Sequence, residues 1–335
     1  MRTRTRRLDA SRPGGELTRV PMPVDAVAAD LSGVPAPGRY VPLITGFGPV
    51  TVHVRDTPGA GDGTAVYLHG LAGSAANWTD LAESLAPNLR GLAVDLPGFG
   101  RSEPPDWFDY GCEQHAHVVI RLLEESGTGA VHLFGNSFGG SVAVLIAARR
   151  PDLVASLTLI SPAMPDLRPD PRRLSDPRIP LAWLPLLGPA VRRRLAAMPP
   201  GERARKLLAL CVADPAAIPD DRLLLAIEEF RERADLAWSE VALGRTTTGL
   251  MWSWLSPPWR SSWHLLPEVQ APGLVVWGAE DRVVSVRKAP RTARELRRGR
   301  LLVLPRTGHV AQLERPRVVA AAVLGMLREV EVDRW

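Results

Sequence analysis

The length and composition of the chain exclude several classes of protein. Its 335 residues, 45% hydrophobic and 23% charged, are enough to bury a sizeable core. The formal net charge of +5 does not indicate nucleic-acid binding, because six arginines against two acidic residues among the first twenty account for +4 of it. Apolar runs stay shorter than the roughly 18 residues of a membrane span, and the first arginines precede nothing like a signal peptide, so we expect a cytoplasmic protein.

The two cysteines, Cys112 and Cys211, lie far apart and lack the spacing of a zinc site or a disulfide framework. We interpret both as buried or incidental thiols. The sequence therefore predicts no metal and no cofactor, and it leaves the oligomeric state open.

Residues 1–37 mix Arg, Pro, Gly and Ala without sustained periodicity, and we interpret them as a basic, disordered or loosely attached arm. A solvated tail without a role of its own is the simpler interpretation of its charge. Order is predicted to begin with strand-like residues 39–43 and 50–54, which Gly46 and Gly48 separate as in a hairpin.

The next part of the chain alternates between strand and helix patterns. Short apolar runs predict strands at residues 64–68, 92–94, 131–134 and 153–160. Helical spacing or small-residue runs predict helices at residues 77–85, 113–125 and 140–148. This alternation implies parallel strands with right-handed crossovers, and therefore a doubly wound, mostly parallel sheet.

Residues 163–262 break the alternation, because they carry helical stripes but no strand pattern. One such stripe consists of Leu223, Ile227, Phe230, Ala234 and Trp238. Six of the ten tryptophans lie in this stretch or directly after it: Trp183, Trp238, Trp252, Trp254, Trp259 and Trp263. We predict an inserted all-helical cap, and we expect some of these tryptophans to line an apolar pocket, since a small cap cannot bury them all.

The sheet pattern resumes after the cap. Apolar runs predict strands at residues 273–277 and 301–304. Helices are predicted at residues 287–298 and 310–330. The second of these is expected to close the domain.

The pentapeptide GNSFG, residues 135–139, stands between a predicted strand and a predicted helix. On such a tight turn Ser137 projects its hydroxyl clear of the backbone, and the helix N-terminus that follows favours a developing negative charge. The flanking glycines allow the close packing and unusual dihedral angles of this turn. Because the bare pattern also arises by chance, it predicts a nucleophile only together with suitable partners.

Candidate partners follow two later strands. Glu280 and Asp281 come after the strand at 273–277, and His309 comes after the strand at 301–304. A serine needs a base within hydrogen-bond reach, and the loop holding His309 is where the catalytic loops of an open α/β sheet collect. The competing histidines fall inside predicted strands or helices or near the end of the cap: His53, His115, His117, His132 and His264.

Five motifs in this order resemble those of the α/β-hydrolase family. They are HGLAGS at 69–74, DLPGFGRS at 95–102, GNSFG at 135–139, WGAED at 277–281 and Gly-His at 308–309. The resemblance implies an α/β-hydrolase fold with its core at residues 38–162 and 263–335. Residues 163–262 then form the helical cap, and residues 1–37 remain a basic disordered arm.

The resemblance also implies roles for individual residues. Ser137 is expected to be the nucleophile, His309 the base, and Asp281, three residues after the loop glycine, the acid that orients the histidine. The oxyanion hole is expected to consist of the backbone N–H groups of Leu71 and Phe138.

Some assignments stay open at this point. The adjacent Glu280 is one alternative acid, and Asp166 is another, since some relatives carry the acid at such a position. His69 is expected to shape the oxyanion loop rather than to react.

A serine at position 137 argues against dehalogenase and epoxide-hydrolase chemistry, because attack on carbon would leave an ether that water does not cleave. We therefore expect a serine hydrolase that cleaves a small to medium apolar carbonyl substrate, an ester, lactone or thioester, through an acyl-serine. Alternatives are carbon–carbon bond hydrolysis of ring-cleavage products, which GNSFGG also resembles, and cofactor-free perhydrolysis. A non-enzymatic small-molecule receptor is a further alternative that need not keep the triad.

Overall fold

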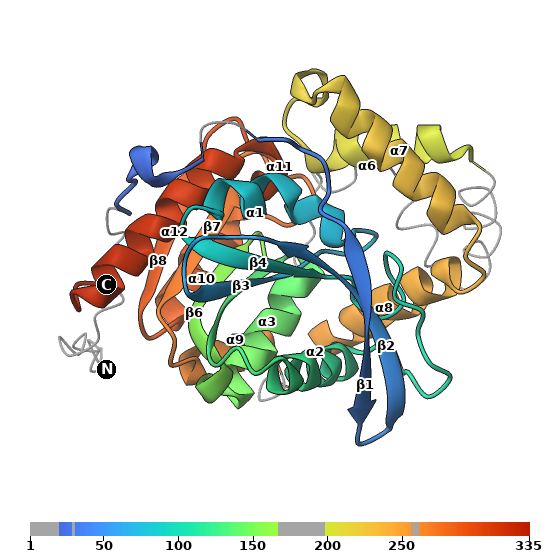
Figure 1. Cartoon of the computed structure of the whole chain (residues 1–335), viewed down its shortest axis with the longest axis horizontal. Helices are drawn as coiled ribbons and strands as arrows, with labels where there is room; N and C mark the ends of the chain where they lie inside the picture. The colour runs from blue at the N-terminus through green and yellow to red at the C-terminus, as the bar shows by residue number, and fades with distance from the viewer. Residues whose placement is uncertain (1–19, 29–30, 167–197, 256, 258–260) are drawn as a thin grey trace, which may run out of the picture.

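The computed structural model describes residues 20–28, 31–166, 198–255, 257 and 261–335, and its core is one eight-stranded sheet (Figure 1). The strands are β1 (Gly38–Thr45), β2 (Gly48–Thr57), β3 (Gly63–Leu68), β4 (Leu89–Val94), β5 (Val131–Asn136), β6 (Val154–Ile160), β7 (Gly273–Gly278) and β8 (Gly299–Leu304). They lie in the order β1-β2-β4-β3-β5-β6-β7-β8, with every pair from β4 to β8 parallel. The predicted doubly wound, mostly parallel sheet is confirmed.

Strands β1 and β2 form the predicted hairpin at one edge of the sheet. Gly48 sits in its turn at φ +138°, and a Cβ there would come within 2.9 Å of the Trp107 indole nitrogen. Glycine is therefore required at this position by both the backbone conformation and the close approach. Figure 1 shows the hairpin extending well beyond the strands behind it.

Helices cover both faces of the sheet (Figure 1). One face packs on α2 (Cys112–Ser126), α3 (Phe138–Arg149) and α10 (Ala289–Glu295), and the other packs on α1 (Thr79–Leu85) and α12 (Pro316–Glu331). Side chains of β3 alternate between the two faces: Val66 and Leu68 join the first apolar cluster, whereas Ala65 and Tyr67 join the second. Because both faces are covered, the central strands are predominantly apolar on both faces, as the sequence pattern indicated.

Two predicted helices differ in the structure. The predicted helix at 310–330 is divided into α11 (Ala311–Glu314) and α12, with Arg315 between them at φ −140° and ψ 49°. Pro316 disfavours helical dihedrals in the residue before it, which explains the break. The predicted helix at 287–298 is shorter, because Leu296 is extended and buried in the core.

The described part of the predicted arm packs against the body, which corrects the expectation of a loose arm for residues 20–28 and 31–37. Val27 is buried, and a Cβ on Gly325 of α12 would collide with the Pro21 carbonyl at 1.8 Å. The backbone N–H of Gly33 donates to Glu83 at 3.1 Å. A few scattered apolar residues without periodicity are enough for this packing, so no sequence pattern could predict the packing. Residues 1–19 lie outside the described part of the chain.

The described residues of the predicted cap form helices and no strand. These helices are α6 (Pro200–Cys211), α7 (Asp220–Ala234) and α8 (Ser239–Trp254), and α9 (Ser262–Leu265) begins at the last residue of the predicted cap. Helices α6 and α7 pack on each other and lie apart from the sheet, as Figure 1 shows. Residues 167–197, with Trp183, and the position of Trp259 lie outside the described residues.

Candidate active site

Ser137 occupies the turn between β5 and α3, as predicted, with φ 52° and ψ −116°. This conformation is unfavourable for a residue with a Cβ, and costs about 1–3 kcal/mol. Backbone hydrogen bonds hold it: the Ser137 N–H donates to the Ile160 carbonyl at 3.1 Å, and the Ala163 N–H donates to the Ser137 carbonyl at 2.8 Å. The turn thus anchors Ser137 between two strands.

The glycines on either side of Ser137 allow this turn to form. A Cβ on Gly135 would lie 2.4 Å from the Gly139 carbonyl oxygen, and one on Gly139 would lie 2.2 Å from the Leu68 carbonyl oxygen. Both clashes are with backbone, which cannot move aside. The glycines of the elbow are therefore required by the packing of α3 on β3 and β5.

His309 and Asp281 contact each other at the ends of β8 and β7. The His309 Nδ1 atom lies 2.9 Å from Asp281 Oδ2, and both side chains are almost completely buried. The other oxygen, Oδ1, accepts hydrogen bonds of 2.8 Å from the backbone N–H groups of Val283 and Val284. Burial alone raises the pKa of Asp281, but the imidazole and these donors outweigh it and lower the pKa.

The two alternative acids lie elsewhere. Glu280 is exposed, and its backbone N–H donates to the Thr307 carbonyl. Asp166 lies 3.9 Å from the buried ammonium of Lys288. The carboxylate that pairs with His309 is therefore that of Asp281.

Asn136 connects the serine turn to the histidine loop. Its side-chain amide nitrogen donates to the Ile160 carbonyl at 3.0 Å and to the His309 carbonyl at 3.1 Å. Since β5, β7 and β8 are parallel, their carboxyl ends meet at the same edge of the sheet, and this amide fixes two of those ends to each other. Sequence analysis did not single out Asn136, because an amide beside a serine carries no spacing signal.

The predicted oxyanion loop lies directly against the turn that holds Ser137. A Cβ on Gly70 would lie 3.0 Å from the Ser137 Cβ, and Leu71 follows Gly70. Phe138 is the first residue of α3, so its N–H has no carbonyl one turn earlier within the helix. The structure thus places Gly70, the residue before Leu71, against Ser137, and Phe138 directly after it.

His69 holds this loop in place. Its Nδ1–H donates to the Gly70 carbonyl at 2.8 Å, and its Nε2 accepts from the Leu96 N–H at 3.0 Å. Burial lowers the pKa of His69, which favours the neutral ring that these two bonds require. This geometry supports the expected role of His69 in shaping the loop.

The turn at residues 95–102 is a second polar cluster behind the oxyanion loop. Buried Asp95 lies 2.7 Å from His53 Nδ1 and accepts from the Ala75 N–H at 2.6 Å and the Arg101 N–H at 3.0 Å. Burial alone raises the pKa of Asp95, but the bond to His53 and the other donors lower it. Gly100, at φ +54°, leaves room for this carboxylate, since a Cβ there would lie 2.1 Å from its carbon.

The remaining histidines have other surroundings. His132 contacts Ser156 at 2.9 Å, and the ring of His115 packs edge-on against Phe138 with centroids 5.0 Å apart. His264 is exposed on α9. In the part of the chain that the structure describes, none of these three imidazoles forms a hydrogen bond with a carboxylate.

The end of cap helix α6 lies against the histidine loop, a contact that sequence analysis missed. The His309 N–H donates to the Cys211 carbonyl at 2.6 Å. Glu314 accepts from the Gly308 N–H at 2.6 Å and from the Ala213 N–H at 2.8 Å, so one carboxylate connects the loop to the cap. Burial raises the pKa of Glu314 and raises that of the Cys211 thiol to about 12.

The described cap tryptophans divide into exposed and half-buried side chains. Trp252 is 66% exposed, so this tryptophan does not line an apolar pocket as some of the cap tryptophans were expected to do. Trp254 is half-buried with the Lys288 ammonium 5.0 Å from its ring centre, and Trp263 is half-buried with its indole N–H donating to the Pro165 carbonyl at 2.9 Å. Two tryptophans thus lie beside the segment that follows Ser161.

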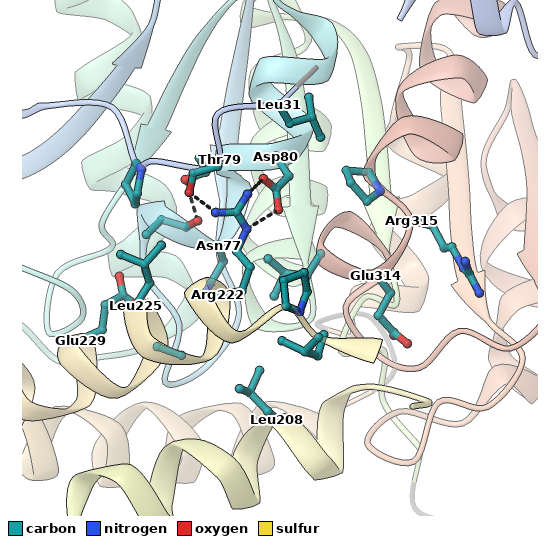
Figure 2. Close-up of a pocket in the computed structure, with 18 of the residues that line it drawn as sticks. Leu31, Asn77, Thr79, Asp80, Leu208, Arg222, Leu225, Glu229, Glu314 and Arg315 are labelled. Atoms are coloured by element: carbon teal, nitrogen blue, oxygen red, sulfur yellow. Dashed lines mark hydrogen bonds and ion pairs between the residues drawn. The ribbon is translucent and has the colours of Figure 1, made fainter. Parts of the chain in front are cut away.

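A large cavity lies beside the predicted triad rather than over it. It has a volume of about 940 Å³ between α6, α7, α1 and α11. Figure 2 shows Arg222 of α7 pointing to Asp80 of α1, with Leu208 and Leu225 on the cap side and Glu314 opposite. Its lining includes Glu280 and Glu314, the sequence neighbours of the triad loops, but not Ser137 or His309.

Two kinds of feature are absent from the part of the chain that the structure describes. No three side chains of His, Cys, Asp or Glu in that part come together as metal ligands. None of the helices described there is both long and apolar enough to cross a membrane.

Residues 66–316 match the profile of the α/β hydrolase fold family. The chain belongs to this family. It is 27% identical over 293 residues to the 2-hydroxy-6-oxononadienedioate/2-hydroxy-6-oxononatrienedioate hydrolase of Cupriavidus pinatubonensis, a match covering 86% of this chain and 94% of that enzyme. The family predicted from the five motifs is confirmed.

Solved structures of this family are also similar to the chain. The 2-hydroxy-6-oxo-6-phenylhexa-2,4-dienoate hydrolase of Rhodococcus sp. strain RHA1 aligns with a TM-score of 0.67 and 25% identity, over 87% of this chain and 100% of that one. A bacterial membrane phospholipase A aligns with a TM-score of 0.70 and 26% identity, over 88% of this chain and 87% of that one. The α/β-hydrolase therefore has relatives whose names indicate two different bond cleavages.

Proposed function

We propose that this α/β-hydrolase is a serine hydrolase that cleaves a small to medium, largely apolar ester, lactone or thioester through an acyl-serine at Ser137. The observation that carries the proposal is the 2.9 Å contact between His309 Nδ1 and Asp281 Oδ2. It lies in loops that Asn136, the residue before Ser137, holds against the serine turn. A buried carboxylate on Nδ1 leaves Nε2 to act as the base.

The reaction follows from these positions. Ser137 Oγ attacks the substrate carbonyl carbon and gives its proton to His309 Nε2, while Asp281 stabilises the imidazolium. The N–H groups of Leu71 and Phe138 bind the oxyanion. The leaving oxygen or sulfur takes the proton from His309, and a water then cleaves the acyl-serine by the same two steps, releasing an acid.

Carbon–carbon bond hydrolysis is a second candidate, favoured by the name of the Cupriavidus relative. That reaction needs the same attack on a carbonyl, but the leaving group is a carbon that must be protonated as it departs. The two reactions therefore differ in whether a group near Ser137 protonates the departing carbon. An ester and a carbon–carbon bond substrate must be compared to separate them.

Fluorophosphonate labelling followed by peptide mass spectrometry tests the nucleophile. We expect one adduct on Ser137 and none in Ser137→Ala, which keeps its fold because a turn hydroxyl contributes little packing. A folded protein without an adduct at Ser137 would contradict the proposal.

The two bond types are then separated by kinetics. We expect kcat/KM for p-nitrophenyl butyrate to exceed that for 2-hydroxy-6-oxo-6-phenylhexa-2,4-dienoate. The reverse order would establish carbon–carbon hydrolysis as the main activity. A cap that supplies an apolar acyl pocket predicts a further rise from acetate to octanoate, up to about 0.8 kcal/mol per methylene until the pocket is full.

A further inference from the structure

Cap helix α7 contacts the oxyanion loop, here meaning residues 69–74, through one partly buried ionic pair. A guanidinium N–H of Arg233 donates to the Ala72 carbonyl, and the Ser74 hydroxyl donates to Glu229 Oε1 at 2.5 Å. Arg233 and Glu229 are one helical turn apart, with charged atoms 4.0 Å from each other, and the Arg233 side chain is only 12% exposed. The two side chains thus face the loop together.

The loop needs such support because its backbone is strained. Ala72 has φ +56°, a left-handed conformation that costs a residue with a Cβ about 1–2 kcal/mol. The N–H of Gly73 closes the turn on the Gly70 carbonyl at 3.0 Å, and Ser74 begins the 3-10 helix η2 (Ala75–Trp78). Leu71, the predicted oxyanion donor, lies inside this turn. Contacts that hold Ala72 and Ser74 in place therefore also fix the direction of the Leu71 N–H.

The neighbouring charges favour the docked position of α7. Arg233 stacks over Phe230 of its own helix, 5.1 Å from the ring centre. About two turns before Glu229 on the same helix, Arg222 pairs with Asp80. Arg101, next to the buried Asp95 turn, pairs with Glu232 at 2.8 Å. Figure 2 shows Glu229 and Arg222 on the same side of α7, facing the elements of the core. Two ion pairs therefore connect α7 to α1 and to the loop after β4, and the hydrogen bonds of Arg233 and Glu229 connect it to the loop after β3.

We propose that Arg233 and Glu229 are positioning residues that make a competent oxyanion hole depend on docking of the cap. When α7 is docked, Arg233 and Glu229 hold the Ala72–Ser74 segment so that the Leu71 N–H faces Ser137. When α7 moves away, the strained turn relaxes and one of the two donors is lost. The inference rests on the proposed serine-hydrolase function and adds a coupling between the cap and catalysis.

The same helix offers a matched control. Glu228 and Arg231 form an ion pair of 3.1 Å on the solvent side of α7, with side chains 58% and 65% exposed. Replacing them changes the same charges on the same helix without touching the loop. The comparison is therefore between Arg233→Ala and Glu229→Gln on one side and Arg231→Ala and Glu228→Gln on the other.

The decisive measurements are kcat and KM for p-nitrophenyl butyrate and the inhibition constant of an alkyl trifluoromethyl ketone, whose tetrahedral adduct places an oxyanion in the hole. We expect Arg233→Ala to lower kcat by at least about tenfold and to raise the inhibition constant of the ketone by the same factor. Complete loss of an oxyanion donor would lower kcat by about a hundredfold or more. KM should change little. The controls should stay within about twofold, and Arg233→Lys, which keeps a donor for the Ala72 carbonyl, should recover part of the loss.

Other outcomes overturn the inference. A variant with unchanged kcat and ketone affinity, or equal losses in the control variants, would show that the contacts only hold the cap in place. If Arg233→Ala does not fold, Glu229→Gln and Arg233→Lys decide by the same two measurements. Failure of the unaltered protein to form the fluorophosphonate adduct would overturn the proposed function and this inference with it, whereas an adduct with an unaffected Arg233→Ala overturns the inference alone.

Discussion

The sheet core and cap helix α7 are stabilised by different forces. All six residues of β7 are buried, as are five of the six in β3. In α7, by contrast, only Ile227 is buried among fifteen residues, and the helix contacts the core through ionic pairs such as Arg222 with Asp80. The core is therefore stabilised by removal of apolar surface from water, whereas the docking of α7 depends on charge-assisted contacts. Cap helix α8 differs from α7, because its Ala242 and Leu250 are buried in the apolar cluster of the core.

This difference matters for the site because each region supplies a different part of it. The predicted triad lies on loops that the buried strands fix, so its geometry follows from the most stable part of the molecule. The cap contacts the oxyanion loop and the histidine loop through polar groups that water can replace. Elements with few buried apolar contacts belong to the low-stability end of a protein, which suits a part that must open for substrate.

The largest effect is expected on the core side of the comparison. Asp281→Asn should lower kcat by about ten-thousandfold. The amide oxygen stays with the two backbone donors, Val283 and Val284, so its NH2 group faces His309 and favours the wrong tautomer. Glu280→Gln, at an exposed neighbour, should change kcat by less than twofold, and a large loss in that variant instead would move the acid to Glu280.

Stability should separate the two regions next. Leu133→Ala in the fully buried centre of β5 should lower the free energy of unfolding by about 3 kcal/mol, because a cavity remains. Leu224→Ala on α7, 65% exposed, should change it by less than about 0.5 kcal/mol. Urea denaturation measures both, and similar losses would show that the cap is as tightly packed as the sheet.

A pH dependence should distinguish the buried Asp95 carboxylate of the core from the cap contacts. The pKa of Asp95 is lowered, so its stabilisation is complete above the unfolded value of about 3.9 and is lost as the pH falls through the folded value. Asp95→Asn should cost about 2 kcal/mol at pH 7, and this difference should shrink below about pH 4. Denaturation at a series of pH values tests this, and a constant difference would contradict it.

The smallest effect concerns opening of the cap. Burial raises the pKa of both Cys211, in the cap, and Cys112, in the core, to about 12, so both thiols should react slowly with iodoacetamide at pH 8. A cap that opens exposes Cys211 alone. We expect Cys211 to be labelled a few times faster than Cys112, with Cys211→Ser and Cys112→Ser identifying each signal by mass spectrometry. Equal rates would indicate that the cap and core open together.

The amino-acid sequence by itself determined the fold, the family and the residues that meet at the sheet edge. Apolar runs, helical spacing and short motifs are local, and in a parallel sheet they place Ser137, Asp281 and His309 at carboxyl ends of strands. The sequence also favoured Asp281 over Glu280, and the contact with His309 agrees with that choice. Pro316 could have indicated the break before α12, because its effect on the preceding residue is local too.

Only the tertiary structure decided how the cap meets the core. Glu314 bridges Gly308 to Ala213, and Arg233 reaches Ala72 across 161 positions of the chain. Charged residues on helices are exposed in most sequences, and no spacing distinguishes Arg233 and Glu229 from Arg231 and Glu228. Which pair faces the loop depends on the rotation and docking of α7, which arise from contacts between segments far apart in sequence. For the same reason residues 20–28 and 31–37, which lack any periodicity, showed their packing on α1 and α12 only in the folded chain.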